Sequence, residues 1–190
     1  MTAARDRRSG PGMDDLARQP APSVLVVMGV SGSGKTTIGT LLAERLGWEF
    51  ADGDDFHPPA NVEKMHGGHP LTDEDRWPWL RAIAAWIDKT CRAGGHGVVA
   101  CSALKRRYRD VLLDGSPAVR LIYLRGGPEV MGRRLAARHG HFMPESLLLS
   151  QYDALEEPDP DEDPITVDVA QRPDEIVDRI LTHLSAVPHP

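Results

Sequence analysis

The sequence has few cysteines, few aromatic residues and no long apolar run. Cys91 and Cys101 are its only cysteines, too few for a disulfide framework or a cysteine zinc site. No stretch reaches the roughly 18 apolar residues of a membrane-spanning helix. Its net charge of −6 is opposite in sign to the basic surface of a general nucleic-acid binder. These absences favour a cytoplasmic protein that binds neither nucleic acid nor membrane.

The remaining composition is that of one globular domain. The 190 residues are 41% hydrophobic and 26% charged. Residues 1–22 mix Arg, Asp, Gly and Pro without apolar periodicity, and we expect them to form a disordered tail. Residues 23–187 are expected to form a single domain. The acidic, proline-containing stretch 153–163 is expected to be a solvated loop or hinge.

Short apolar runs alternate with amphipathic segments along this domain. Strands are expected at 23–28, 48–51, 97–102, 119–124 and 165–169. Helices are expected at 36–46, 58–65, 73–92, 104–113, 128–138, 144–155 and 173–184. Thr72 and Asp75 form a variant of the capping box at the start of the third helix. The alternation predicts an α/β fold in which helices cover both faces of a parallel sheet.

A glycine-rich loop follows the first expected strand. Residues 29–36 read GVSGSGKT and match G-x-x-x-x-G-K-[ST] at every fixed position. Small residues let backbone N–H groups converge on phosphate oxygens, and the following helix adds its dipole. Lys35 would lie between the β- and γ-phosphates, and the Thr36 hydroxyl would bind Mg²⁺. The expected nucleotide contacts are Gly29, Val30, Ser31, Gly32, Ser33, Gly34, Lys35, Thr36 and Thr37.

Acidic residues follow the second expected strand, in the sequence Asp52-Gly53-Asp54-Asp55. Open α/β sheets bind ligands at the carboxyl ends of their strands. Asp52 and Asp54 would point the same way if the extended conformation persisted. We expect Asp52 to hold Mg²⁺ through water and Asp54 to accept the proton of an attacking hydroxyl. The alternative is a solvated turn capped by its own Asp side chains.

Four segments, in this order, resemble the gluconokinases, ATP-dependent D-gluconate 6-kinases of the shikimate-kinase-like group. They are GVSGSGKT, DGDDFHPPANVEKMHGGHPLTDEDRWPWL, CSALKRRYRD and RHGHFMPESLLLSQYDALEEP. The resemblance covers about residues 24–185. It implies a P-loop NTPase fold with a five-stranded parallel sheet in the order 2-3-1-4-5. It also implies a lid at about 137–145, a substrate-binding helical segment at about 54–80, and a homodimer.

The resemblance implies that ATP, with Mg²⁺, phosphorylates D-gluconate to 6-phospho-D-gluconate. Cations are expected around this substrate because gluconate carries a carboxylate. His57, Lys64 and Arg76 lie in the segment that the resemblance assigns to substrate binding. Lys105 and Arg109 are four residues apart, which places two cations on one face of the expected helix. Exposed ion pairs or a solvated face are the alternatives for these cations.

Further basic residues surround the expected lid. By resemblance, Arg134 and Arg138 would neutralise charge on the transferring phosphoryl group. His141 is assigned to the substrate, with a capping or structural role as the alternative. Arg172 lies in a loop that resembles the one packing on adenine in this group. The expected catalytic residues are therefore Lys35, Asp54, Arg134 and Arg138.

Two other functions stay open at this point. One is a kinase of the same scaffold that acts on a different small molecule, such as a shikimate-like acceptor. The segments HPPANVEKM and SALKRRYRD argue against it. The other is a nucleotide-dependent switch without a small-molecule acceptor. Stimulation of ATP use by a polyol acid would distinguish a kinase from a switch.

Overall fold

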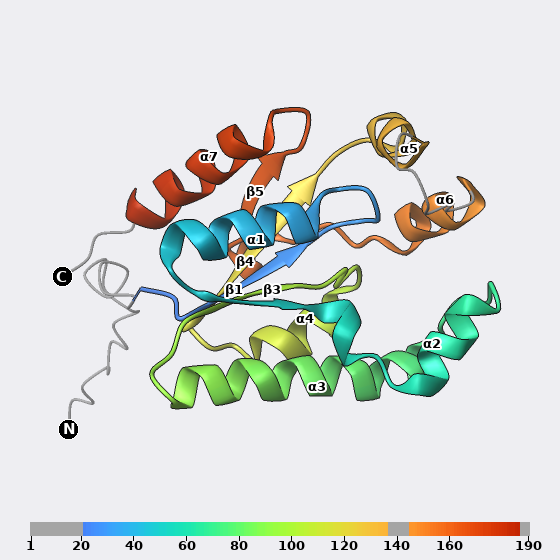
Figure 1. The fold of residues 1–190 in the computed structure, drawn as a ribbon, viewed down its shortest axis with the longest axis horizontal. Coiled ribbons are helices and arrows are strands. Elements are labelled where there is room, and N and C mark those ends of the chain that lie inside the picture. The colour runs from blue at the N-terminus through green and yellow to red at the C-terminus, as the bar shows by residue number, and fades with distance from the viewer. Residues whose placement is uncertain (1–20, 137–144, 187–190) are drawn as a thin grey trace, which may run out of the picture.

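A computed structural model describes residues 21–136 and 145–186 of the chain. In it, five parallel strands form one sheet in the order β2-β3-β1-β4-β5, which confirms the expected fold (Figure 1). The strands are β1 (Val24–Met28), β2 (Glu49–Asp52), β3 (Gly97–Ala100), β4 (Val119–Arg125) and β5 (Ile165–Asp168). Their carboxyl ends meet at one edge, where the sequence places the phosphate loop and the acidic turn.

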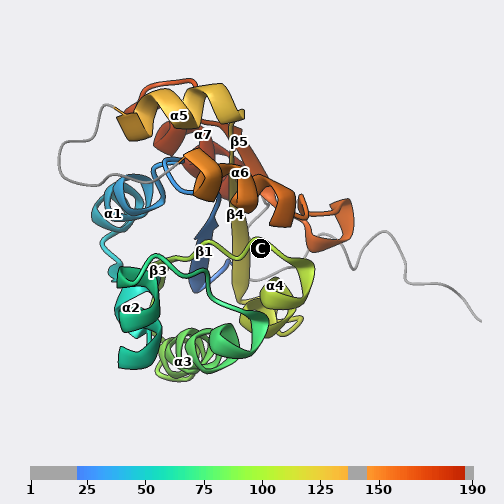
Figure 2. The same ribbon diagram turned by 90° about the vertical axis from the view of Figure 1, so that its right-hand side faces the viewer.

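Helices cover both faces of this sheet. They are α1 (Lys35–Leu46), α2 (Pro59–His66), α3 (Asp73–Arg92), α4 (Arg106–Leu113), α5 (Pro128–Ala136), α6 (Glu145–Ala154) and α7 (Pro173–Ala186). Two short 3₁₀ helices are η2 (Gly53–Phe56) and η3 (Pro160–Glu162). Figure 1 shows α1 and α7 on one face and α3 and α4 on the other. Figure 2 looks onto the carboxyl edge, where α6 lies between α5 and α4.

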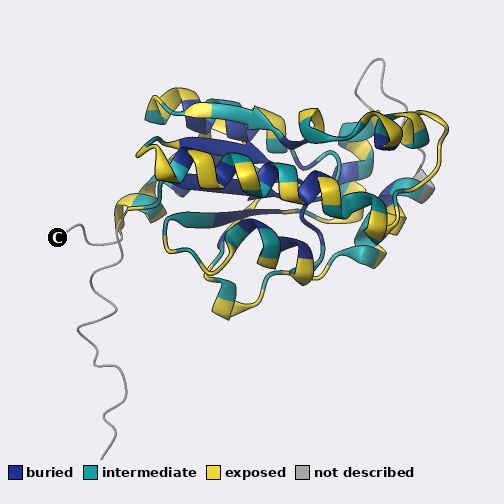
Figure 3. Cartoon of the chain, turned by 90° about the horizontal axis from the view of Figure 1, so that it is seen from below, coloured by how far each residue is buried: buried dark blue, intermediate teal, exposed yellow. Residues whose placement is uncertain are grey.

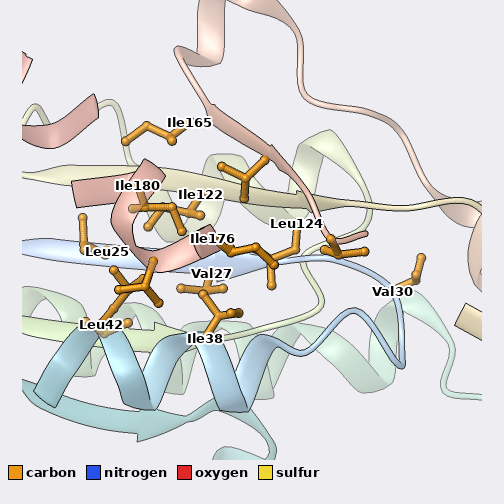
Figure 4. Close-up of a cluster of buried hydrophobic side chains, with 14 of the residues drawn as sticks. Leu25, Val27, Val30, Ile38, Leu42, Ile122, Leu124, Ile165, Ile176 and Ile180 are labelled. Carbon is orange, nitrogen blue, oxygen red and sulfur yellow. The ribbon is translucent and has the colours of Figure 1, made fainter. Parts of the chain in front are cut away.

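The central strand β1 is buried on both faces, which explains its uninterrupted apolar sequence. Leu25 and Val27 face the layer of α1 and α7, where Ile38 and Leu42 pack (Figure 4). Val24, Val26 and Met28 face α3 and α4. Figure 3 shows the sheet interior fully buried and the helices striped by exposed residues. The phosphate loop therefore begins directly after a strand that is fully buried.

Several expected boundaries shift, and one of them matters for the site. The predicted helix 104–113 begins at Arg106, because Ala103 has a φ of 45° and Lys105 is extended and caps the helix. Helix α3 has its predicted bounds, and the reciprocal hydrogen bonds of its capping box are both present. The second strand ends at Asp52, one residue later than expected. Lys105 consequently precedes the helix instead of lying on its face.

Some expectations fall outside the described residues. These are the tail, apart from residues 21 and 22, and the lid, apart from residue 145, at which α6 begins. Arg138 and His141 belong to this group. The domain limits therefore stay predictions.

Candidate active site

The phosphate loop connects β1 to α1 through glycines in a conformation that other residues rarely adopt. Gly32 has a φ of 82° and Gly34 a φ of 93°. The Lys35 ammonium group donates to the Val30 carbonyl oxygen at 3.2 Å. The Ser33 backbone N–H donates to that same oxygen, also at 3.2 Å. The loop is thus curled over its own lysine at the start of α1, as phosphate binding requires.

Thr36 and Asp52, the two residues predicted to hold magnesium, lie in direct contact. The Thr36 hydroxyl donates to Asp52 Oδ2 at 2.9 Å. The other carboxylate oxygen of Asp52 accepts from the Asp54 backbone N–H at 3.1 Å and so caps η2. A hydroxyl and a carboxylate are oxygen ligands of the kind that Mg²⁺ prefers. The pair therefore fits a magnesium ion at the phosphates, and the capped turn of the alternative interpretation is present as well.

The condition under which Asp52 and Asp54 would point the same way, an extended chain beyond Asp52, is not met. The chain leaves the extended conformation at Gly53, so strand alternation does not set the direction of Asp54. Instead, the 3₁₀ turn holds Asp54 through its backbone, which also accepts from the His57 N–H at 3.3 Å. The Asp54 residue itself is exposed at the carboxyl edge. Its carboxylate is therefore accessible to a substrate.

Gly53 fixes the distance between this turn and the sheet. A Cβ atom at Gly53 would lie 2.2 Å from the Ala100 carbonyl oxygen in β3, which is backbone and cannot move aside. We expect Gly53→Ala to displace Asp52 and Asp54, to cost about 1–3 kcal/mol of stability and to abolish most activity. The control is Gly132→Ala, because nothing lies within 4 Å of a Cβ at Gly132. Thermal melts and turnover check both variants; a normally active Gly53→Ala enzyme would contradict this account.

His57 is held on the turn by aromatic stacking. Its ring lies on Trp79, with 4.3 Å between centroids, and the Trp79 indole donates to the Gly53 carbonyl at 2.6 Å. Burial lowers the pKa of His57; Asp54 raises it and Arg76 lowers it, both by smaller amounts. Folding therefore favours the neutral imidazole. Trp79 is buried, as expected of a packing residue.

Two of the predicted substrate cations make hydrogen bonds near the start of α3, one from α2 and one from the first turn of α3 itself. Lys64 pairs with Asp75 at 2.5 Å. Hydrogen bonds from Lys64 and then from Thr72 lower the pKa of Asp75 to about 2. The Arg76 guanidinium donates to the Leu71 carbonyl oxygen at 3.3 Å.

Three cationic side chains lie around the ring of Tyr108 and connect α3 to α4. Arg76, Lys105 and Arg107 lie 5.7–5.8 Å from its centroid, and we call these three residues the basic cluster. Asp73 accepts hydrogen bonds from Lys105, Arg107 and the Tyr108 hydroxyl. The Glu156 charge also acts on Tyr108, so three cations face two carboxylates and one positive charge is in excess. The sequence analysis missed Arg107, Tyr108 and Asp73, although the run Lys105-Arg106-Arg107 was a signal.

Arg109 is not part of this cluster, and its expected pairing with Lys105 does not occur. Its side chain is fully buried and makes two hydrogen bonds to Glu162, at 2.5 and 2.8 Å. It also donates to the carbonyl oxygens of Ala103, Leu104 and Glu156. Arg109 thus connects α4 to the acidic stretch 153–163. That stretch was expected to be a solvated loop, but the Glu162 side chain within it is buried. The prediction of Arg109 as a substrate ligand is incompatible with this burial.

A pocket of about 220 Å³ lies on the other side of the phosphate loop. Its lining is Gly32, Ser33, Gly34, Thr37, Ile38, Arg134, Pro173 and Ile176. Arg134 donates to the Val169 carbonyl, which holds it beside the start of α7. Arg172 precedes Pro173, and its backbone N–H donates to Glu175. The apolar side chains at this end suit the flat base of a nucleotide whose phosphates lie in the loop.

The phosphate loop, the acidic turn and the sheet order define a P-loop kinase, and comparisons with known proteins agree. A family model described as shikimate kinase matches residues 31–185. The gluconokinase of Gluconobacter oxydans is 48% identical over 87% of this chain and 93% of its own. The thermosensitive gluconokinase of Escherichia coli is 47% identical over 76% of this chain and 78% of its own. The chain belongs to the gluconokinases, within the shikimate kinase family.

Solved structures give the same result. The crystal structure of a gluconokinase from Sinorhizobium meliloti superposes with a TM-score of 0.80 at 46% identity, covering 88% of this chain and 94% of that one. A shikimate kinase from Aquifex aeolicus, at 15% identity and a TM-score of 0.55, shares the fold. It covers 86% of this chain and 96% of that one.

Proposed function

We propose that this protein transfers the γ-phosphoryl group of ATP to the 6-hydroxyl of D-gluconate, giving 6-phospho-D-gluconate and ADP. The observation that carries the proposal is the arrangement of the carboxyl edge. The contact between Thr36 and Asp52 joins the phosphate loop to the turn that presents Asp54. The names of the relatives supply the acceptor, because their sequences match along most of this chain.

In this proposal the phosphates lie in the loop, and Lys35 reaches between the β- and γ-phosphates. Thr36 and Asp52 hold Mg²⁺, directly or through water; the ion would offset charge on the phosphate oxygens. Asp54 accepts the proton of the attacking hydroxyl and orients its oxygen toward the γ-phosphorus. The apolar pocket beside Pro173 takes the base. Arg134, which lines this pocket together with glycines of the phosphate loop, keeps its proposed role of neutralising charge on the phosphoryl group.

The basic cluster is proposed to bind the substrate carboxylate. Its excess positive charge is held rigidly by Tyr108 and Asp73, so little side-chain entropy is lost on binding. His57 and Lys64 are proposed to contact the hydroxyl groups of the substrate. Arg138 and His141 keep their proposed roles at the phosphoryl group and the substrate.

Oligomeric state and compartment are also proposals. We propose a homodimer in the cytoplasm, on the resemblance and on the composition. Among residues 21–136 and 145–186, no helix combines the length and apolar character needed to cross a membrane.

The test is release of ADP from Mg·ATP in the presence of D-gluconate, shikimate, AMP or no acceptor. We expect strong stimulation by D-gluconate alone, with phosphate found on the 6-hydroxyl by NMR. Stimulation by a different acceptor would replace gluconate in the proposal. A flat response with intact ATP binding would favour a nucleotide-dependent switch.

A further inference from the structure

Helix α6 contacts the phosphate loop through Gln151, which lies 120 residues after its partner Ser31. Gln151 Oε1 accepts from the Ser31 backbone N–H at 2.7 Å. Gln151 Nε2 donates to the Ser31 hydroxyl at 2.9 Å. The two bonds need an acceptor and a donor in fixed places, which a carboxamide supplies in one orientation only. The contact therefore specifies the position of one peptide group in the loop.

That peptide group is the one that carries the contact to Lys35. The Ser31 N–H and the Val30 carbonyl belong to the same planar unit and point in opposite directions. The carbonyl oxygen accepts from the Lys35 ammonium group at 3.2 Å, while the N–H is held by Gln151. Rotation of this plane would move the oxygen that Lys35 contacts. Gln151 and Lys35 thus bind opposite sides of one rigid peptide, whose carbonyl oxygen the Ser33 N–H also contacts.

Gln151 is not what fixes α6 in place, because other bonds do so. The Tyr152 hydroxyl donates to the Gly126 carbonyl, beyond the end of β4, at 2.7 Å. Just after the helix, the Glu156 backbone N–H donates to the Leu104 carbonyl at 2.8 Å, and its carboxylate accepts from the Arg106 N–H at 2.6 Å. The end of α6 is therefore attached to the segments that follow β3 and β4, which lie on both sides of β1 (Figure 2). Gln151 connects this fixed helix to the phosphate loop.

We propose that Gln151 is a positioning residue for phosphoryl transfer, holding the Val30–Ser31 peptide so that Lys35 is aimed at the β- and γ-phosphates. This inference rests on the proposed kinase function and adds a residue to it. Preorganised groups contribute to transfer only when their geometry is fixed before the reaction. A small rotation of the peptide would leave the protein folded and slow the chemical step.

The first test compares Gln151→Ala with a matched control in the next residue, Tyr152→Phe. Both variants remove bonds between α6 and the carboxyl edge, but only the first touches the loop. We expect Gln151→Ala to lower kcat about 10–100-fold with an unchanged KM for gluconate. Tyr152→Phe should keep the wild-type kcat even if its melting temperature falls further. Ser31→Ala, which keeps the backbone bond, should lose much less activity than Gln151→Ala.

Equal losses of kcat in Gln151→Ala and Tyr152→Phe would mean that helix anchoring, and not the peptide, is responsible, and would overturn the proposal. Wild-type activity of Gln151→Ala would overturn it too. A wild-type enzyme that gluconate does not stimulate would count against the proposed function alone. The inference would then be decided by nucleotide binding, which needs no acceptor.

The second test is therefore a double-mutant cycle on ATP affinity, using Gln151→Ala and Lys35→Met. If Gln151 acts through Lys35, its loss weakens ATP binding in the wild-type background and has no further effect without the lysine. AMP, which lacks the β- and γ-phosphates, should bind all four proteins alike. Additive effects on ATP binding would show that Gln151 does not act through Lys35.

Discussion

Replacing Asp54 with Asn is expected to lower turnover by about 10²–10⁴-fold, the range that a general base contributes. The amide cannot accept the proton of the substrate hydroxyl. The turn should keep its shape, because the contacts of Asp54 with Asp52 and His57 are made by its backbone. ATP affinity should change little, since in this proposal the Asp54 carboxylate contacts the acceptor hydroxyl and not the nucleotide.

The control is Asp55→Asn, which removes the same charge from the next residue of the same exposed turn. It should retain near-normal turnover. The measurement is gluconate-dependent ADP release, together with ATP binding by calorimetry. Near-normal turnover of Asp54→Asn would remove Asp54 from the mechanism, and equal losses in both variants would point to net charge at the turn.

Replacing Arg109 with Leu is expected to destabilise the fold by about 3–5 kcal/mol, the cost of breaking a buried ion pair from one side. The substitution leaves the Glu162 carboxylate, 2% exposed, without its cation. It also removes the donor for three backbone carbonyl oxygens. The control is Arg106→Leu in the same helix. The Arg106 side chain is 39% exposed and its ion pairs are screened by solvent, so its loss should destabilise the fold far less than the loss of Arg109.

Acidity provides a second measurement of the same ion pair. Burial is the largest single influence and acts to raise the pKa of Glu162. The hydrogen bonds and charge of Arg109, the hydrogen bond from the Asp159 backbone and the charge of Arg106 together outweigh it, and the pKa is lowered overall. The pair therefore stabilises the fold fully above the ordinary glutamate pKa, and this is lost as the pH falls through the lowered value. In Arg109→Leu, burial stays while the hydrogen bonds and the charge of Arg109 are lost, so the pKa of Glu162 should rise. The stability gap between the proteins should then narrow on acidification, as urea melts across pH would show; a widening gap would contradict this.

The sequence was sufficient to predict the strands, the phosphate loop and the place of the acidic turn at the carboxyl edge of the sheet. The apolar run of β1, the pattern of residues 29–36 and the capping box at Thr72 are local signals, set by residues a few positions apart. The contact between Thr36 and Asp52 was predictable as well, because parallel strands bring their carboxyl ends to one edge. The order of the strands came from the resemblance, since periodicity does not specify neighbours.

Only the tertiary structure decided which charged residues stay at the carboxyl edge of the sheet and which hold the fold together. Lys105 and Arg109 look alike in the sequence, but the left-handed turn at Ala103 leaves Lys105 at the carboxyl edge. Arg109 is buried against Glu162, 53 residues away. Gln151 gave no local signal, because its hydrogen-bond partner is a peptide group 120 residues earlier in the chain. Three-dimensional packing determines which partner a side chain contacts. Spacing along one helix or strand specifies only the face of that element on which the side chain lies.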